Sequence, residues 1–337
     1  MSKFFGKKLG IDLGTANSVV FVEGEGIVLT EPTVVALDLE KSSILAVGDE
    51  AKDMLGKTPD NIVAKRPLRN GVIADSRITE SLLKYFFNKA LGSNRFFKPN
   101  VIISVPAGIN SVERRAVIKA AMSAGARKIH LMPEPLLAAI GAGIPIYKSS
   151  GNMIVNMGGG TTEIGVVSLN GLVKSSSLRI SGDAMNEAIV NYMRRKHSFS
   201  IGEQTAERVK IEIGSCIKVN EPSSMQVKGR DSVSGMPKSI DIDSNEVASA
   251  LQNPLNQIID EIHSVLERTP PEISSDIIDK GIVLSGGTAL ITNIDKLFAK
   301  ATGVPVYLAD EPMYCVANGT GSVLEMMAGG DFSFASW

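Results

Sequence analysis

Short runs of β-branched residues alternate along the chain with segments in which apolar residues recur at helical spacing. Residues Val101–Val105 (VIISV) form one such run and predict a buried strand. Asn110 follows, with Glu113 three positions later, which is the spacing of a capping box that opens a helix. Residues 184–196 and 247–266 each predict an amphipathic helix. Strands that alternate with such helices indicate α/β layers.

One longer pattern occurs twice, once in each half of the chain. Residues 9–29 read LGIDLGTANSVVFVEGEGIVL, and residues 153–173 read MIVNMGGGTTEIGVVSLNGLV. In each copy an apolar strand contains one polar residue, Asp12 or Asn156, and a Gly/Thr turn follows. A second apolar strand, a Gly-containing turn and a third strand come next. The repetition predicts two copies of one α/β domain.

Length and charge narrow the classes of protein. The chain has 337 residues, with 35 Lys plus Arg against 36 Asp plus Glu, and that length predicts two domains. The balanced charge argues against a nucleic-acid partner. Cys216 and Cys315 are too few for a disulfide framework, and we interpret His130, His197 and His263 as structural. Without a secretory pattern or an apolar run of about 20 residues, we expect a cytoplasmic protein.

The repeated turns are candidates for phosphate binding. A Gly-rich turn between strands exposes backbone N–H groups, and two such turns facing each other would bind a polyphosphate from both sides. Asp12 would then hold Mg²⁺ through water, while Thr15, Thr161 and Thr162 supply hydroxyl groups. A single turn of this kind would be interpreted as a tight hairpin, but two turns in matched context favour a nucleotide site.

A third Gly turn, Gly286–Gly287, follows another apolar strand, and a helix is predicted to begin near Ala289. Upstream, Glu207 and Lys210 stand three residues apart on one predicted helical face. They either reach a ribose or an adenine edge, or form a solvated ion pair with each other.

These motifs resemble the actin-like ATPase superfamily in their order: IDLGTAN, PEPLLAAIGAG, GGGTTEI, AERVK and LSGGTALI. The segments EPTVVAL, NGVIAD, VERRA and PPEISSDI are similar to the MreB family of bacterial actins, and the resemblance runs from about Leu9 to about Glu325. It implies an α/β actin-like fold of two duplicated domains, each with a smaller subdomain, around a cleft for ATP or ADP with Mg²⁺. It also implies assembly into double protofilaments.

The resemblance places domain I at residues 1–148 plus 316–337, with a small subdomain at about 33–67. Domain II spans 149–315, with a small subdomain at about 183–245. The nucleotide-binding residues implied are Gly14, Thr15, Ala16, Asn17, Gly158, Gly159, Gly160, Thr161, Thr162, Glu207, Lys210, Gly286, Gly287 and Thr288.

The resemblance also assigns chemistry. It gives Glu134 and Thr161 the task of positioning the attacking water, and it gives Asp12 the metal, with Asn156 assisting weakly through water. A structural salt bridge is the alternative role for Glu134.

Three positions depart from the family's pattern. Asn156 stands where the family has Asp, and an amide is neutral and cannot act as a base. We therefore expect nucleotide binding to persist and hydrolysis to be weakened. Pro133 stands where a second acidic residue is common, and Thr288 replaces the third Gly of the adenosine turn, where it is expected to tighten the base pocket.

Two aromatic pairs predict contact with a membrane. Phe4 and Phe5, and Phe96 and Phe97 within residues 94–99, are flanked by Lys and Arg, a combination that suits anionic lipid. The alternative is that each pair is an ordinary exposed or core-packed feature.

The function implied by the resemblance is a filament-forming ATPase, peripheral on the inner face of the cytoplasmic membrane, that organises cell-wall synthesis and rod shape. Its implied partners are copies of itself, membrane lipids, and MreC, MreD and RodZ-type morphogenesis proteins. The alternatives are a small-molecule kinase of the same superfamily and a chaperone ATPase. For the chaperone, the chain leaves no room for a peptide-binding domain.

Overall fold

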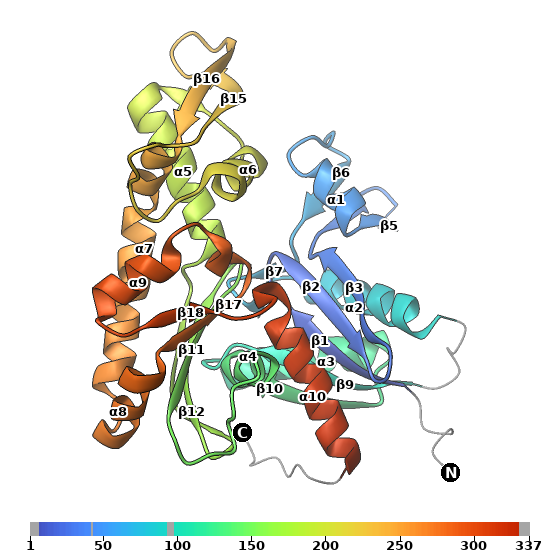
Figure 1. Ribbon diagram of the computed structural model, residues 1–337. Helices are drawn as coiled ribbons and strands as arrows, with labels where there is room; N and C mark the ends of the chain where they lie inside the picture. Colours follow the sequence, from blue (N-terminus) through green and yellow to red (C-terminus); the bar gives the residue numbers. More distant parts are fainter. Residues whose placement is uncertain (1–6, 42, 93–97, 330–337) are drawn as a thin grey trace.

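The computed structural model of the chain describes residues 7–41, 43–92 and 98–329. Its two large sheets stand next to each other, each with helices on its outer face (Figure 1). The first sheet has the strand order β10-β9-β1-β2-β3. Its strands are β1 (Lys8–Leu13), β2 (Asn17–Val22), β3 (Gly26–Pro32), β9 (Asn100–Val105) and β10 (Lys128–Pro133). The predicted strand at 101–105 is therefore confirmed as part of β9.

The second sheet repeats the first. Its order is β13-β12-β11-β17-β18, and it matches the first sheet when that sheet is read from β3 to β10, since both then have two antiparallel pairs followed by two parallel pairs. Its strands are β11 (Asn152–Met157), β12 (Thr162–Ser168), β13 (Gly171–Leu178), β17 (Ile282–Ser285) and β18 (Val306–Leu308). The predicted duplication is confirmed, since the two sequence copies occupy corresponding strands.

Two helices join the halves. The helices α4 (Glu134–Gly141) and α10 (Cys315–Gly329) lie between the sheets (Figure 1). Buried side chains from both helices and both sheets form one cluster that includes Leu136, Ile154 and Val323. The helices approach closely at Gly319, where an added Cβ would lie 2.0 Å from the Leu137 carbonyl oxygen. This packing fixes the two sheets relative to each other.

Other helices cover the outer faces of the sheets. They are α2 (Ser76–Leu91) and α3 (Ser111–Ala124) beside the first sheet, and α7 (Ser244–Glu267), α8 (Pro271–Lys280) and α9 (Ile294–Thr302) beside the second. The capping box is confirmed at the start of α3: the Asn110 side chain accepts from the Glu113 N–H, and the Glu113 carboxylate accepts from the Asn110 N–H.

Two small subdomains stand at one end of the large sheets (Figure 1). One contains β4 (Val35–Asp38), β5 (Ser43–Val47), β6 (Ile62–Lys65) and α1 (Asp49–Met54). The other contains α5 (Gly182–His197), α6 (Glu203–Ile213), β14 (Phe199–Ser200), β15 (Ser224–Asp231) and β16 (Pro237–Asp243). A two-stranded ribbon, β7 (Leu68–Arg69) with β8 (Val72–Ile73), follows the first. The predicted helices at 184–196 and 247–266 are confirmed within α5 and α7, whereas the exact domain boundaries stay a prediction.

One expected helix is wrong. The segment near Ala289 is a short 3-10 turn, η1 (Gly287–Leu290), and the next α-helix begins only at Ile294. The cause is Thr292, which bridges to Ser215 and whose carbonyl accepts from the Cys216 N–H at 2.9 Å. That pairing keeps the backbone out of helical conformation before α9.

Candidate functional site: a cleft between the two halves

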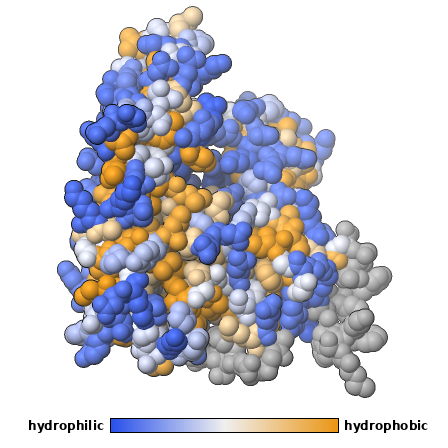
Figure 2. Space-filling model, in the orientation of Figure 1, coloured by the Kyte–Doolittle hydropathy of each residue, from blue (hydrophilic) through white to orange (hydrophobic). Residues whose placement is uncertain are grey.

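A cavity of about 300 Å³ lies between the two halves, where the ends of β1 and β11 meet. In Figure 2 the surface is hollowed between the two lobes that carry the small subdomains. Sixteen residues expected from the sequence line it together: Asp12, Gly14, Thr15, Ala16, Asn17, Glu134, Asn156, Gly158, Gly159, Gly160, Thr161, Glu207, Lys210, Gly286, Gly287 and Thr288. Residues from five separate stretches of sequence therefore surround one cavity.

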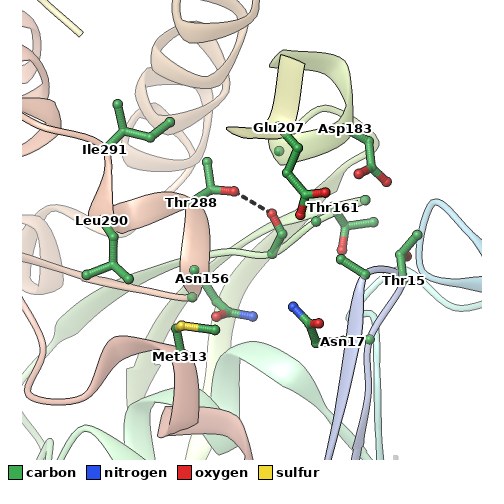
Figure 3. A pocket seen from close by; sticks show the side chains of 18 of the residues that line it. Thr15, Asn17, Asn156, Thr161, Asp183, Glu207, Thr288, Leu290, Ile291 and Met313 are labelled. Carbon is green, nitrogen blue, oxygen red and sulfur yellow. Dashed lines mark hydrogen bonds between the residues drawn. The ribbon is translucent and has the colours of Figure 1, made fainter. Parts of the chain in front are cut away.

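The cavity has a polar and an apolar side. Figure 3 shows Leu290, Ile291 and Met313 on one side, and Thr15 and Asn17 on the other. Leu290 is 52% exposed although it is a large apolar residue, as expected for a pocket wall without a covering side chain. Such a cavity suits a ligand with a flat apolar end and an anionic end. The sequence reasoning missed these three residues because nothing in the sequence separates an apolar pocket wall from core.

The two Gly turns touch each other. A Cβ added at Gly159 would lie 2.5 Å from the Ala16 Cβ, and one at Gly160 would lie 2.5 Å from the Thr15 hydroxyl oxygen. These glycines are therefore required by the approach of the two turns, in addition to leaving room for an anion. The contact brings the backbone N–H groups of both halves to one place.

Asp12 and Asn156 occupy matching positions. The Ser104 hydroxyl, on the neighbouring parallel strand β9, donates to Asp12 Oδ1 at 2.8 Å. Correspondingly, the Ser285 hydroxyl on β17 donates to Asn156 Oδ1 at 3.1 Å. Burial raises the pKa of Asp12 to about 6, against the lowering effect of the Ser104 hydrogen bond.

The donor set fits a hydrated Mg²⁺ ion better than a metal held directly by protein. Among the residues that the structure describes, no three His, Cys, Asp or Glu side chains converge to hold a metal. Asp12 is a carboxylate at the cavity wall, and Mg²⁺ characteristically keeps several waters while binding one or two carboxylates and substrate phosphates.

Glu134 is the first residue of α4 and is only 8% exposed. Burial raises its pKa well above the usual range, and the negative charges of Glu163 and Asp12 raise it further. No salt bridge involving Glu134 occurs among the described residues, so the alternative structural pairing finds no partner there. Its environment gives the carboxylate a high affinity for a proton.

Glu163 was missed by the sequence reasoning. It is fully buried on β12, where it accepts hydrogen bonds from the Ser177 hydroxyl and, at 2.9 Å, from the Ala107 N–H. Burial raises its pKa to about 7, and its two hydrogen bonds lower it. The signal was present, because a Glu within the apolar run TEIGVV has to find partners or stay protonated.

Glu207 and Lys210 lie at the cavity, but their charged groups have other partners. Glu207 pairs with Lys52 of the opposite small subdomain at 3.2 Å. Lys210 Nζ donates to the Gly182 carbonyl at 2.9 Å, and burial lowers the pKa of Lys210 to about 8. The alternative, a solvated ion pair between Glu207 and Lys210, is therefore wrong, because Lys210 is buried and Glu207 pairs with Lys52.

Two threonines differ from expectation. Thr162 does not line the cavity, because its buried hydroxyl donates to the Ile180 carbonyl at 2.8 Å. The Thr162 hydroxyl, which was expected to contact phosphate, therefore points away from the cavity to Ile180. The Thr288 hydroxyl donates to the Gly158 carbonyl at 2.7 Å, as the dashed line in Figure 3 marks. Thr288 therefore contacts the second Gly turn, Gly158–Gly160, in addition to lining the cavity.

The expected membrane residues Phe4, Phe5, Phe96 and Phe97 lie outside the described residues. Within 7–41, 43–92 and 98–329, no helix combines the length and apolar character needed to cross a bilayer. Cys216 and Cys315 are both free and buried.

Duplicated sheets, a central cleft and paired Gly turns define the class as an actin-like fold with a candidate nucleotide site. Solved structures agree. The chain superposes on the crystal structure of MreB5 of Spiroplasma citri bound to ADP with a TM-score of 0.92, at 37% identity, covering 96% of this chain and 98% of that one. A MamK double helical filament shares the fold, with a TM-score of 0.80 at 22% identity, covering 95% and 98% of the two chains.

Sequence comparisons are more specific. The model of the MreB/Mbl protein family matches residues 6–330. The cell shape-determining protein MreB of Escherichia coli (strain K12) is 50% identical over 335 residues, which cover 97% of this chain and 96% of the relative. The cell shape-determining protein Mbl of Bacillus subtilis (strain 168) is 48% identical over 323 residues, covering 96% and 97%. This chain belongs to the MreB/Mbl family, and the expected resemblance is confirmed.

Proposed function

We propose that this chain binds ATP and ADP with Mg²⁺ in the central cleft, and that the bound nucleotide controls assembly into filaments. The observation that carries the proposal is the contact between the two Gly turns at the polar end of a cavity whose other end is apolar. Relatives support it, since the MreB5 structures are bound to ADP and to AMPPNP.

Titration calorimetry with ATP and with GTP, each in Mg²⁺ and in EDTA, tests nucleotide binding. We expect Mg²⁺-dependent binding of ATP, because Asp12 would hold the ion through water between itself and the phosphates. No heat of binding with either nucleotide would refute the proposal.

For hydrolysis, we propose that Glu134 and Thr161 orient a water molecule toward the γ-phosphorus. The water oxygen bonds to phosphorus, the bond from that phosphorus to the bridging oxygen of ADP breaks, and the water proton passes to Glu134. Mg²⁺ would supply neutralisation of charge on the phosphates. The place of Glu134 in the cavity wall, together with Thr161, supports this role. Glu134→Gln should lower phosphate release roughly a hundredfold and leave ATP binding intact.

We further propose that Asn156 makes hydrolysis slow. It sits opposite Asp12 in the duplicated fold but brings no negative charge to order metal-bound water. Nucleotide binding through backbone N–H groups does not depend on that charge, so slow turnover and normal binding are expected together.

Assembly and membrane attachment complete the proposal. We propose protofilaments of copies of this chain, attached peripherally to the inner face of the cytoplasmic membrane through Phe4, Phe5, Phe96 and Phe97. Many weak anchors on one filament would give firm attachment by avidity. There the filament would organise cell-wall synthesis with MreC, MreD and RodZ-type proteins.

Sedimentation with ATP tests assembly, and strictly monomeric behaviour with sugar-dependent turnover would instead support the kinase alternative. Pelleting with anionic liposomes tests attachment. A Phe96→Ser, Phe97→Ser variant should lose binding while still forming filaments, and undiminished binding would refute the loop assignment. Restoration of rod shape in bacteria depleted of their own MreB tests the cellular role.

A further inference from the structure

The carbonyl of Gly158 accepts three hydrogen bonds from two separate segments of the chain. The Thr288 hydroxyl donates at 2.7 Å from η1, and the Ser181 hydroxyl donates at 2.6 Å from the residue before α5. The Gly182 N–H adds a longer bond of 3.3 Å. Gly158 is the first residue of the second phosphate turn, so this carbonyl joins that turn to both the apolar wall and the small subdomain.

The sequence of that turn explains why such bonds matter. Gly158, Gly159 and Gly160 have no Cβ, so sterics alone leave the peptide planes between them free to rotate. In a planar trans peptide, the carbonyl of one residue and the N–H of the next point in opposite directions. Whatever holds the Gly158 oxygen therefore also sets the direction of the Gly159 N–H.

Ser181 bonds through its hydroxyl to Gly158 and does not cap its own helix. It is the N-cap residue of α5, a position where a serine hydroxyl usually accepts from the first turn of the helix, yet it makes no such capping bond. Its hydroxyl donates to Gly158 instead. The neighbouring Asp183 N–H donates to the Gly159 carbonyl at 2.8 Å. This bond fixes the peptide between Gly159 and Gly160 in the same way.

Thr288 is equally well fixed. It is 6% exposed, and its turn is held by the Gly286 N–H, which donates to the Pro312 carbonyl at 2.7 Å. Gly286 has a φ of 84° and packs against the Met157 backbone, where an added Cβ would lie 2.3 Å from the carbonyl oxygen. The hydroxyl of Thr288 is thus presented to Gly158 by a rigid turn.

We infer that Thr288 and Ser181 are positioning residues for the phosphates: together they turn the Gly158 carbonyl away from the ligand and so direct the Gly159 N–H toward it. This inference rests on the proposed nucleotide site. It assigns to Thr288, a departure from the family's third glycine, a role in phosphate binding in place of base binding. Because two hydroxyls share one acceptor, either one alone still holds the peptide partly, and losing both leaves only the longer bond from the Gly182 N–H.

The test measures displacement of a fluorescent ATP analogue by ATP and by AMP for Thr288→Val, Ser181→Ala and the double variant. We expect each single change to weaken ATP roughly two- to fivefold and the double change about twentyfold or more, since a net hydrogen bond is worth close to fivefold. AMP, which lacks the outer phosphates, should change less than twofold. Thr288→Ser keeps the hydroxyl and should bind ATP with nearly wild-type affinity.

Thr269→Val is the matched control. Thr269 is also 6% exposed, and its hydroxyl donates to a carbonyl, that of Val265, at the same 2.7 Å, but at the end of α7. It should leave ATP affinity unchanged. Equal losses for ATP and AMP in the double variant would overturn the inference, because they would indicate a change in the base pocket.

Amide hydrogen exchange of residues 158–161, measured without nucleotide, gives a readout independent of ligand. In the double variant the exchange rate should rise at residues 158–161 and stay the same in β1 and β9. An unaltered exchange rate at residues 158–161 would overturn the inference. If the wild-type protein binds neither ATP nor the analogue, the proposed function itself fails. If the wild type binds ATP and the double variant binds it equally well, only the inference on Thr288 and Ser181 fails.

Discussion

The ends of β1 and β11 have matching strand neighbours but side chains that differ in charge. Each strand end has an antiparallel hairpin on one side and a parallel strand on the other, and each receives a serine hydroxyl from that parallel strand. The first ends in a carboxylate, Asp12, and the second in an amide, Asn156. The duplicated fold thus supplies two equivalent positions that differ in charge, and we propose that the metal binds at the charged one, Asp12.

Electrostatics explains why the difference matters. Glu134 and Glu163 are buried and Asp12 is partly buried, and the charges of Asp12 and Glu163 already raise the pKa of Glu134. A fourth carboxylate at position 156 would raise these pKa values further unless a cation balanced it. Asn156 therefore keeps the negative charge of the cleft lower than an Asp at this position would.

The largest expected effect comes from making the two strand ends alike. Asp12→Asn should weaken Mg²⁺-dependent ATP binding by up to about a hundredfold and leave binding in EDTA nearly unchanged, because the only charge of the matched pair is removed. Calorimetry in both buffers measures it. Asn156→Ala, the matched change in the other half, should cost far less, and equal losses would contradict the division of roles.

The reverse exchange should give the next largest effect. Asn156→Asp restores a charge that can order metal-bound water, so phosphate release in Mg²⁺ should rise about tenfold. Single-turnover phosphate release measures the chemical step directly. Asn156→Ser, which adds no charge, serves as control, and a rate equal to that of the wild type in the Asp variant would remove the explanation for slow hydrolysis.

The two serine partners should differ in their effect on stability. Ser104 donates to a carboxylate and Ser285 to a neutral amide. In EDTA at pH 7.5, Ser104→Ala should lower the free energy of unfolding by about 2 kcal/mol and Ser285→Ala by about 1 kcal/mol. Urea denaturation measures both.

The same serine comparison has a pH dependence with a definite sign. The folded-state pKa of Asp12 is about 6, so the carboxylate that Ser104 stabilises is present above that pH and lost below it. The gap between the two variants should therefore narrow as the pH falls from 7.5 to 5. A gap that stays constant would mean that the charge of Asp12 does not distinguish the two serines.

The smallest effect is expected where the two halves meet at the mouth of the cleft. Lys52 and Glu207 are partly exposed, with side chains 32% and 20% accessible, so their ion pair should contribute less than about 1 kcal/mol to the free energy of unfolding. Lys52→Met should change the urea midpoint little. A double-mutant cycle with Glu207→Gln would isolate the pair, and a coupling well above 1 kcal/mol would contradict this ranking.

Local sequence was sufficient where the deciding contacts are local. The capping box at Asn110 and Glu113 involves residues three apart, and the Gly/Thr turns between strands are equally short-range. The repeated pattern predicted the duplicated sheets for the same reason, since strand alternation and turn chemistry act within each copy. The failure near Ala289 came from a distant partner, Ser215, which pairs with Thr292.

The duplicated halves, the glycines of the two matched turns and the contrast of Asp12 with Asn156 could all be predicted from the sequence. Which hydroxyl bonds to which group depended on the tertiary fold. Thr162 turns to Ile180, whereas Thr288 reaches Gly158, 130 residues away in sequence. Glu163 likewise meets Ala107 across the two halves. Side-chain direction in these cases depends on how separate segments pack, and no short-range pattern encodes that packing.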